Sequence, residues 1–496
     1  MSALPTELYT AVAVRALDRA AIERAGIPGL TLMQRAGAAA WRALRARWPQ
    51  ARRPVLVCGP GNNGGDGWIV AALAQADGLA PCVVEIGERR ASGPDAAAAR
   101  SAALAAEVPA TRELAALADA DLVVDALFGI GLTREVAGEF RAAIEAMNAR
   151  AAAGVPVLAL DIPSGLHADT GAVLGAAVRA SATVSFIGLK AGLVTGAAVD
   201  HLGELVFDEL GTPASIRAGI APLGRRVTAA TRAALLPRRP RSAHKGDHGH
   251  VLLVGGAPGY AGAARLAAEA ALRSGAGLVS VAVHPDCAAQ LNLGRPEIMV
   301  HAVATPAALR PLLKRASVVA IGPGLAQSEW SAAMFGAVRD ARQPLILDAD
   351  ALNLLARDAQ TRADWVLTPH PGEAARLLGC TTREINADRY AAAATLAARY
   401  GGVAILKGAG SVVAGAGQLE VVAGGNPGMG SGGMGDVLTG IVAALRGQGL
   451  AAFDAASHGA ALHAAAADLA AAEGERGLLA SDLFVPLRRL VNAPGR

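Results

Sequence analysis

Three segments in the first half of the sequence combine glycine with Asn, Asp or Ser directly after an apolar run. They are Val55–Gly67, Asp125–Gly131 and Asp161–Gly171. Backbone N–H groups of a Gly-rich turn that opens a helix can bind a phosphate group. The first segment lacks the Lys-Ser/Thr of a Walker loop and the following acidic residue of a dinucleotide-binding GxGxxG motif. A tight turn would explain its glycines, but not the polar side chains of Asn62, Asn63 and Asp66.

Asp125 and Asp161 open the other two segments and could move protons. In an open parallel sheet, the loops after the carboxyl ends of the strands gather at one edge and form the ligand crevice. We therefore expect both carboxylates at that edge, where a positioned carboxylate acts as a general acid or base. Loop capping is the alternative for either residue taken alone. The helix after the first segment is expected to begin near Trp68.

In the second half, the most specific spacing belongs to Leu406–Ser411 and Asn426–Asp436. The second run is rich in glycine and ends at Asp436, where we expect a helix to begin. Backbone N–H groups at such a place bind anions, but the Asp436 carboxylate would repel a phosphate group. A base that takes the proton from an attacking hydroxyl group explains it better, because phosphoryl transfer needs an anion site and a base. An N-cap aspartate is the alternative.

The elements that position these residues alternate between apolar runs and helical patterns. Such alternation predicts βαβ units around mainly parallel sheets, and the fold class is therefore α/β. Helices are expected over residues 1–50 and at Trp68–Ala76, Glu139–Arg150 and Ala451–Ala472, and Ala261–Ser280 is expected to contain a helix followed by the Gly-rich turn Arg273–Gly277. The expected strands are Pro54–Gly59, Cys82–Gly87, Leu122–Leu127, Val157–Asp161, Ala182–Gly188 and Leu205–Leu210, then His250–Gly255, Leu278–Val283, Ser317–Ile321, Leu345–Asp348, Trp365–Thr368, Val403–Leu406 and a hairpin of Ser411–Ala414 with Gln418–Val422.

The length of 496 residues exceeds one ordinary core and predicts two domains. Three prolines with mixed charge occur between Ala218 and Pro240, and the regular alternation is interrupted there. We place the boundary near residue 220, which gives domains at residues 1–220 and 221–496.

The first-half segments resemble the YjeF N-terminal family, the NAD(P)H-hydrate epimerases, over about residues 10–215. The runs Asn62–Gly67 and Asp161–Gly165 carry this resemblance. It implies a Rossmann-like three-layer sandwich that interconverts the R and S hydrates of NADH and NADPH. In these hydrates the ring nitrogen can expel the neighbouring hydroxyl group, and re-addition from the other face inverts the carbon. Asp161 is our choice for the proton transfer.

The same resemblance assigns ligands in the first half. Asn63, Asp125 and Ser164 would hold a potassium ion, whereas Lys190 matches a family segment without a clear role. The family usually has Asp where His167 stands. By the same resemblance, the phosphates of the hydrate would be bound by Asn62, Asn63, Gly64, Gly65 and Asp66. The segment that would close over the hydrate consists of Gly129, Ile130, Gly131, Leu132, Thr133, Arg134 and Glu135, and Asp161 would also contact the hydrate.

The second half resembles the ribokinase-like superfamily and, more closely, the ADP-dependent NAD(P)H-hydrate dehydratases over about residues 225–492. This implies that phosphate passes from ADP, with Mg²⁺ beside it, to the hydroxyl group of the S hydrate. Phosphate then departs more easily than hydroxide, which leaves NADH or NADPH with AMP. By resemblance, the hydrate contacts are Ala263, Gly324, His370 and Asp436, and the nucleotide contacts are Lys407, Gly408, Ala409, Gly410, Ser411 and Gly435.

Two other functions fit parts of the pattern. One is a small-molecule kinase of the ribokinase type with a regulatory first half, and the other is a nucleotide sensor without catalysis. Neither would regenerate NADH from its hydrate in the presence of ADP, so that assay separates the three.

The composition argues against several classes of protein. The net charge is only +4 and aromatic residues make up 3%, which argues against nucleic-acid binding; the basic cluster Arg238–Arg241 fits a solvated linker. The cysteines form no CxxC pair, so neither a zinc site nor a disulfide framework is expected. We see no signal peptide and no membrane-spanning run. We therefore expect a cytoplasmic homo-oligomer with no membrane partner.

Lysine is rare in this sequence and marks a few positions. It occurs only at Lys190, Lys245, Lys314 and Lys407, while all other basic side chains besides histidine are arginines. If composition replaces ordinary surface lysines by arginine, the remaining lysines are enriched for special positions. Arg and Lys differ in geometry, however, so the two residue types do not replace each other freely at every site.

Overall fold

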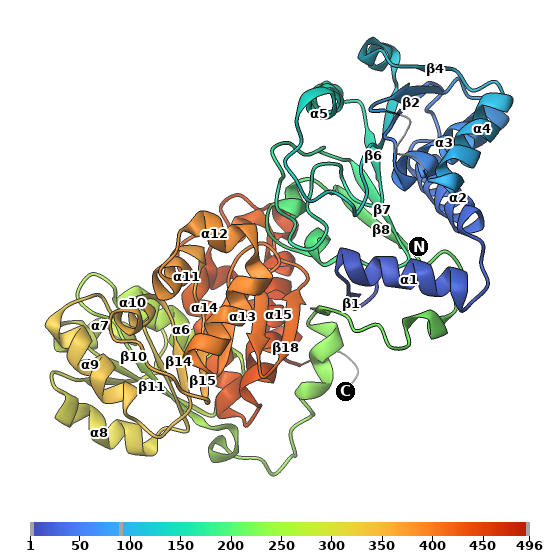
Figure 1. The fold of residues 1–496 in the computed structure, drawn as a ribbon. Coiled ribbons are helices and arrows are strands. Elements are labelled where there is room, and N and C mark those ends of the chain that lie inside the picture. Colours follow the sequence, from blue (N-terminus) through green and yellow to red (C-terminus); the bar gives the residue numbers. More distant parts are fainter. Residues whose placement is uncertain (1–3, 89–92, 493–496) are drawn as a thin grey trace. The chain divides into compact units, whose positions relative to one another are not determined.

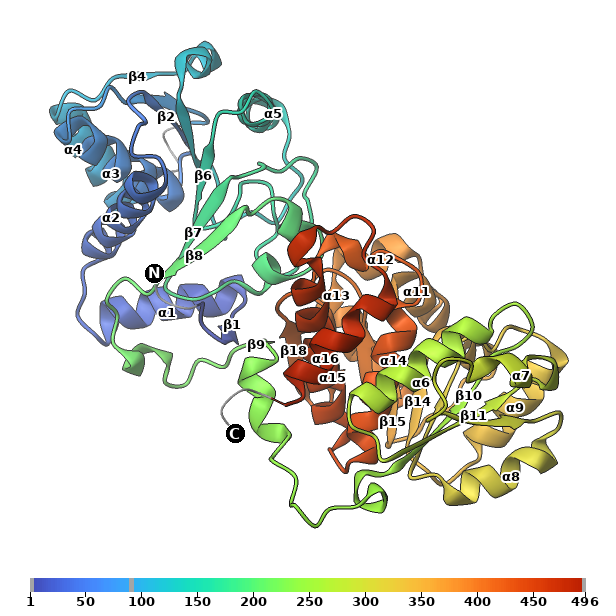
Figure 2. The ribbon, with the colours of Figure 1, turned by 180° about the vertical axis from the view of Figure 1, so that it is seen from behind.

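The computed structural model describes residues 4–88 and 93–492. The chain divides into two compact units, Met1–Arg225 and Arg226–Arg496. Each unit contains a mainly parallel sheet with helices packed against it (Figures 1 and 2). The α/β fold class predicted from the sequence is therefore confirmed.

The sheet of the first unit is parallel throughout, in the strand order β4-β3-β2-β5-β6-β7-β8. From β2 the chain moves outward to β3 and β4, then returns to the other side of β2 at β5. Loops that leave the carboxyl ends of β2 and β5 diverge at this reversal and open a crevice. The strands are β2 (Pro54–Cys58), β3 (Cys82–Glu85), β4 (Ala110–Thr111), β5 (Leu122–Ala126), β6 (Val157–Leu160), β7 (Ala182–Phe186) and β8 (Glu204–Asp208).

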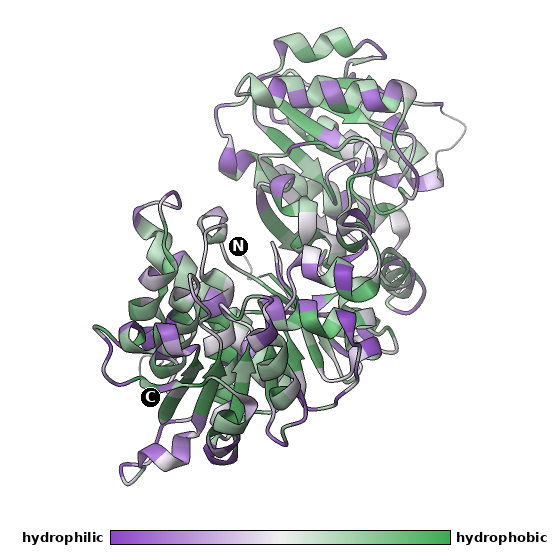
Figure 3. Cartoon of the chain, turned by 90° about the vertical axis from the view of Figure 1, so that its left-hand side faces the viewer, coloured by the Kyte–Doolittle hydropathy of each residue, from purple (hydrophilic) through white to green (hydrophobic). Residues whose placement is uncertain are grey.

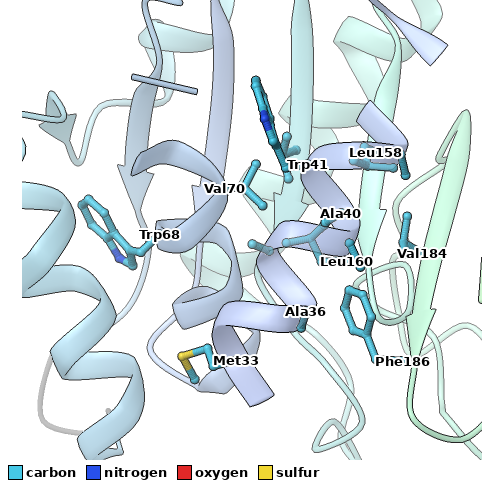
Figure 4. Close-up of a cluster of buried hydrophobic side chains, with 14 of the residues drawn as sticks. Met33, Ala36, Ala40, Trp41, Trp68, Val70, Leu158, Leu160, Val184 and Phe186 are labelled. Carbon is cyan, nitrogen blue, oxygen red and sulfur yellow. The ribbon is translucent and has the colours of Figure 1, made fainter. Parts of the chain in front are cut away.

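Helices cover both faces of this sheet and make it a three-layer sandwich. Alternate strand residues point to opposite faces, so Leu56 packs in one hydrophobic cluster and Val55 in the other. Figure 4 shows Ala36 and Ala40 of α2 beside the strand residues Leu160 and Phe186. One layer contains α1 (Ala11–Glu23), α2 (Gly29–Arg47), α3 (Asn62–Ala76) and α4 (Pro94–Ala105), and the other contains α5 (Gly138–Ala152).

The sheet of the second unit runs in the order β18-β17-β16-β15-β14-β13-β10-β11-β12. Pairing is parallel from β16 to β12, and the hairpin β17–β18 adds two antiparallel strands. The strands are β10 (His250–Val254), β11 (Leu278–Val283), β12 (Met299–Ala302), β13 (Val318–Ile321), β14 (Leu345–Leu347), β15 (Trp365–Leu367), β16 (Val403–Leu406), β17 (Val412–Gly415) and β18 (Gln418–Val422).

Two helices of the second unit begin at the site described below, α11 (Pro371–Leu378) and α14 (Met434–Gly447). Helix α14 packs against α6 and α15 in a core of Ala, Val, Ile and Leu. The others are α6 (Ala261–Arg273), α7 (Ala288–Leu291), α8 (Pro306–Arg315), α9 (Glu329–Arg339), α10 (Ala349–Arg357), α12 (Thr382–Ala387), α13 (Arg389–Tyr400), α15 (Ala452–Ala470) and α16 (Phe484–Leu490).

The sequence did not predict four short strands: β4, β12, β1 (Glu7–Leu8) and β9 (Gly224–Val227), of which β1 pairs with β9. Two of them have only two residues, and β12 contains His301 and is half-buried, so none forms an apolar run. Figure 3 shows that the central strands are hydrophobic, whereas polar residues are mixed into the helices. None of the helices in the described ranges is both long and apolar enough to cross a lipid bilayer.

Candidate active sites

The run Asn62–Gly67 of the first unit, which is rich in Gly and Asn, lies inside a helix. Helix α3 begins at Asn62, so the prediction that it begins near Trp68 is wrong. The glycines carry no apolar side chain to mark a helical face, but they permit close packing. A Cβ on Gly64 would collide with the Gly59 carbonyl oxygen, and one on Gly65 would lie 2.6 Å from Met33 Sδ. These two glycines therefore bring the helix close to its neighbours.

A cavity of about 800 Å³ opens at the carboxyl edge of the first sheet. Of the residues expected to contact substrate, three do not line it. Gly64 and Gly65 are buried in packing, and Glu135 is exposed beside the cavity. Those that do line it are Asn62, Asn63, Asp66, Gly129, Ile130, Gly131, Leu132, Thr133, Arg134 and Asp161.

Oxygen atoms gather beneath the floor of this cavity around Asp125, which is fully buried. Ser164 Oγ donates to Asp125 Oδ1 at 2.6 Å, and the Ser164 backbone N–H donates to Oδ2 at 2.8 Å. Burial raises the pKa of Asp125 to about 6, although these hydrogen bonds act in the opposite direction. Asn63 Nδ2 donates to the Phe128 carbonyl at 2.9 Å, whereas the buried Asn63 Oδ1 has no hydrogen-bond partner. The predicted trio of Asn63, Asp125 and Ser164 is thus brought together.

Asp161 follows β6 in a left-handed backbone conformation, with φ of +66°. Such a conformation is uncommon outside glycine and is often found where a side chain is held for a purpose. The side chain forms an ion pair with Lys190, whose own side chain is 1% exposed. Lys190 Nζ also donates to Phe186 O at 3.0 Å and to Ser185 Oγ at 3.2 Å. The cation is thus fixed against Asp161 at the cavity wall.

Three further carboxyl groups line the same cavity: Asp18 from α1, Asp66 from α3 and Asp95 from α4. Burial raises the pKa of Asp66 well above its ordinary value, and the neighbouring Asp161 and Asp18 raise it further. Burial likewise raises the pKa of Asp18 to about 6. A carboxylate surrounded in this way does not suit phosphate binding, which was the role expected of Asp66.

In the second unit, Asp436 lies in the first turn of α14. The N-cap residue of this helix is Gly433, at φ of +92°, so the alternative of an N-cap aspartate is wrong. Burial raises the pKa of Asp436 to about 7, with a further increase from Asp348 and a decrease from Lys407. A carboxyl group that titrates near neutral pH can accept a proton effectively.

Lys407 connects three strand-end segments of the second sheet. Its Nζ donates to Asp348 Oδ1 at 2.7 Å and lies 3.8 Å from Glu373 Oε2. Thr439 Oγ1 donates to Asp348 Oδ2 at 2.9 Å. Although burial lowers the pKa of Lys407, Asp348 and Glu373 outweigh this effect and raise it overall. The Lys407 side chain remains 19% exposed and can contact a ligand.

The expected nucleotide segment Lys407–Ser411 forms a tight turn after β16. Ser411 Oγ accepts a hydrogen bond from Gly408 N at 3.3 Å, and Gly408 has φ of +141°. The buried Arg389 donates to the Leu406 and Lys407 carbonyls, both at 3.2 Å. A Cβ on Gly435 would lie 3.2 Å from Lys407 Nζ. The structure therefore brings the turn and the Gly-rich start of α14 together.

The residues expected to contact the hydrate lie in three different segments of the second unit. Gly324 accepts a hydrogen bond from Ala257 N at 2.8 Å, and this places the segment after β13 beside the one that leads into α6 and Ala263. His370 caps α11, where its Nδ1 accepts from Gly372 N at 3.0 Å. Burial and the nearby Lys407 lower the pKa of His370. Its Nε2 lies 3.5 Å from Glu373 Oε1.

Two family models match this chain. The model described as YjeF-related protein N-terminus matches residues 29–192, and the one described as NAD(P)H-hydrate dehydratase matches residues 251–489. The bifunctional NAD(P)H-hydrate repair enzyme of Coxiella burnetii is 47% identical over 490 residues, which are 98% of this chain and 100% of that protein. The chain belongs to this family.

Solved structures resemble the second half of this family member. A ribokinase-like superfamily protein of Enterococcus faecalis is 27% identical with a TM-score of 0.52, over 54% of this chain and 96% of its own. An ADP/ATP-dependent NAD(P)H-hydrate dehydratase of Bacillus subtilis, co-crystallised with ATP and Mg²⁺, is 31% identical with a TM-score of 0.47, over 53% of this chain and 96% of its own. The predicted ribokinase-like fold of the second domain is confirmed.

Several site residues of this repair-enzyme family member were not predicted. Asp18 lies within the helical stretch predicted over residues 1–50, and nothing in the sequence spacing connects it with β6. Asp348 and Glu373 lie at or shortly after the ends of the predicted strands Leu345–Asp348 and Trp365–Thr368, where ordinary turn chemistry explains polar side chains equally well. The rarity of lysine was the available signal for Lys190 and Lys407, because both form ion pairs with carboxylates, Lys190 fully buried and Lys407 partly exposed.

Proposed function

We propose that this chain repairs hydrated NADH and NADPH, with epimerase chemistry in residues 1–220 and dehydratase chemistry in residues 221–496. The observation that carries this proposal is the presence, in one chain, of two sheet-edge sites with a carboxyl group of raised pKa. Full-length similarity to the Coxiella burnetii enzyme supports the same pairing of activities.

In the first unit, Asp161 would accept the proton when water adds to the hydrate ring. Its ion pair with Lys190 holds the carboxylate in place at the cavity wall. Asn62, Asn63 and Gly129–Arg134 line the remaining wall and would hold the rest of the substrate. At the start of α3, backbone N–H groups without helical partners are suitable for a phosphate.

A potassium ion fits the oxygen atoms around Asn63, Asp125 and Ser164. The buried Asn63 Oδ1 needs a positive partner, and a carboxylate, a hydroxyl group and the Phe128 carbonyl lie around it. Hard cations prefer such oxygen ligands. The ion would supply positive charge beneath the cavity floor and hold the Phe128–Gly129 backbone in place.

In the second unit, Asp436 would take the proton of the S hydrate's hydroxyl group as the oxygen attacks the terminal phosphate of ADP. Lys407, the turn Gly408–Ser411 and Gly435 would bind that phosphate, while Ala263, Gly324 and His370 Nε2 would position the hydrate. Mg²⁺ bound to the nucleotide would offset phosphate charge. Loss of phosphate from the phosphorylated hydrate then gives the reduced dinucleotide.

The direct test is incubation of the full chain with NADH hydrate, Mg²⁺ and either ADP or ATP. We expect recovery of the near-ultraviolet absorbance of NADH, faster with ADP, and conversion of R hydrate as well as S hydrate. Faster turnover with ATP would overturn the nucleotide preference and leave the repair activity standing. A phosphorylated product without NADH recovery would show a small-molecule kinase instead.

A further inference from the structure

The cavity of the first unit holds more carboxyl groups than its buried cation can neutralise. Asp18, Asp66 and Asp161 all line it, together with Asp95 near its rim. The cations in its wall are Arg15, Arg134 and Lys190. Arg15 donates to the Ile130 carbonyl at 3.3 Å, and Arg134 is exposed. Lys190 is thus the only buried cation among the described residues of the cavity wall.

Every N–H group of Lys190 is already committed. An ammonium group has three donors, and these go to Asp161 Oδ1, Phe186 O and Ser185 Oγ. No donor remains for Asp66 or Asp18. Within the described ranges, no hydrogen bond or ion pair from another residue reaches either of those carboxyl groups.

The three carboxyl groups therefore differ in what they can do. Asp161 forms an ion pair with the buried Lys190, whereas Asp66 forms no ion pair or hydrogen bond with another residue of the described ranges. Asp66 lines the cavity together with Asp161 and Asp18, and burial and both of these neighbours raise its pKa. A carboxyl group that retains its proton in this way can act as an acid in the same cavity in which Asp161, held by its cation, can act as a base.

We propose that Asp66 is the proton donor of the epimerisation, and that Lys190 is the positioning residue that reserves Asp161 as the proton acceptor. This proposal rests on the epimerase function proposed for the first unit. It replaces the expected phosphate contact of Asp66 and gives Lys190 a role.

The proton transfers balance over one turnover. The Asp66 proton passes to the hydroxyl oxygen as the carbon–oxygen bond breaks, the nitrogen lone pair forms a carbon–nitrogen double bond, and water is released. Water then adds to the other face of the carbon, the electron pair returns to nitrogen, and Asp161 takes the proton from the added water. Transfer of that proton to Asp66 through the cavity restores the starting state, so none is consumed.

The test follows conversion of R hydrate into S hydrate by the full chain, without ADP, by chromatography across a range of pH. Asp66→Asn should slow conversion by about 100-fold or more, since that is what general acid catalysis commonly contributes. Lys190→Met should move the acidic limb of the rate profile to higher pH, because the variant removes the positive charge that is paired with the proton acceptor. A purely structural lysine would lower the rate without moving the limb.

Thr183→Val is the matched control for the lysine variant. Thr183 is a buried polar residue of the same strand region, and its Oγ1 donates to the Leu202 carbonyl at 2.8 Å. Its loss should leave the acidic limb in place. If Lys190→Met fails to fold, infrared spectra decide: wild type at neutral pH should show a protonated carboxyl band that Asp66→Asn lacks.

The outcomes separate this proposal from the one on which it rests. If wild type does not accelerate the conversion, both the epimerase function and the assignment of Asp66 as its proton donor are wrong. If wild type converts the hydrate and Asp66→Asn does so equally fast, only the proton donor is wrong. An unmoved limb in a folded Lys190→Met, or an unchanged infrared band in Asp66→Asn, would also overturn the inference.

Discussion

The two units each hold a lysine against a carboxylate at the carboxyl edge of a parallel sheet. In the first unit Lys190 pairs with Asp161 after β6, and in the second Lys407 pairs with Asp348 after β14. A further carboxyl group of raised pKa stands near each pair: Asp66 in the first unit and Asp436 in the second. Two unlike chemistries thus use a similar set of charges.

The difference lies in where each lysine can reach. Lys190 is 1% exposed with all its donors used, whereas Lys407 is 19% exposed and lies beside the Gly435 backbone. A fully enclosed lysine can only set the charge state of its partner. A partly open one can also bind a charged ligand such as a phosphate. In the proposed mechanisms, the same residue type therefore serves proton transfer in one site and anion binding in the other.

The largest expected effect separates the two sites by their bases. Asp436→Asn keeps the side-chain volume but removes the base, so ADP-dependent dehydration should fall by about 100-fold or more. Asp161→Asn should instead stop interconversion of the epimers, and R hydrate should accumulate while S hydrate is still dehydrated. Chromatography of both epimers with each variant measures this. Loss of epimerisation in a folded Asp436→Asn would show that the sites are not independent.

The sequence was sufficient to predict the sheets and the edge at which ligands bind. Apolar runs such as Leu278–Val283 and Val403–Leu406 became strands with the predicted ends. Asp161 and Lys407 directly follow β6 and β16, because the carboxyl ends of parallel strands gather at one edge of such a sheet. Asp436 lies in the first turn of α14. This part of the site depends on local pattern and on one general rule of topology.

What the sequence could not predict depends on close packing. The glycines of α3 hide a helix start because they carry no apolar face, although they fit against Gly59 and Met33. Asp18 approaches the cavity only through the docking of α1 on the sheet. The pairing of Lys190 with Asp161 likewise joins residues 29 positions apart through the fold. Such contacts leave no periodic signal.

A second comparison removes each lysine in turn. Lys407→Met should raise the KM for ADP by about 10- to 100-fold, since hydrogen bonds to charged groups are worth about 1.5–3 kcal/mol. Lys190→Met should leave that KM unchanged, because Lys190 belongs to the other unit. Dehydration rates at varied ADP concentration measure both. An unchanged KM in Lys407→Met would mean that this lysine serves only Asp348.

The pH dependence of dehydration tests the state of Asp436. Its pKa of about 7 in the folded chain implies that the base is mostly protonated at pH 6, so the rate there should be about one tenth of the plateau at alkaline pH. The folded state binds this proton more tightly than the unfolded chain does. Stability from this group is therefore full below about pH 4 and is lost as the pH rises through about 7.

Asp436→Asn should then raise the thermal stability of the second unit relative to wild type at pH 8 and not at pH 4. Calorimetry at the two pH values measures this. A wild-type dehydration rate that is flat between pH 6 and 8 would contradict the assignment of Asp436 as the base.

The smallest expected effects come from two glycines near the starts of corresponding helices, Gly65 in α3 and Gly435 in α14. In Gly65→Ala the new Cβ meets Met33 Sδ at 2.6 Å and Ala96 Cα at 3.0 Å. Overpacking of this kind commonly costs about 1–3 kcal/mol, so the first unit should lose stability while the KM for the hydrate stays nearly constant.

In Gly435→Ala the Cβ lies 3.2 Å from Lys407 Nζ and 3.6 Å from Asp348 Oδ2. There the lysine must shift, and the KM for ADP should rise a few-fold with little change in the melting temperature. Thermal unfolding and steady-state kinetics on both variants provide the comparison. A ligand-specific defect in Gly65→Ala would restore the idea that this glycine admits a phosphate, and a purely structural defect in Gly435→Ala would remove the backbone of α14 from the nucleotide site.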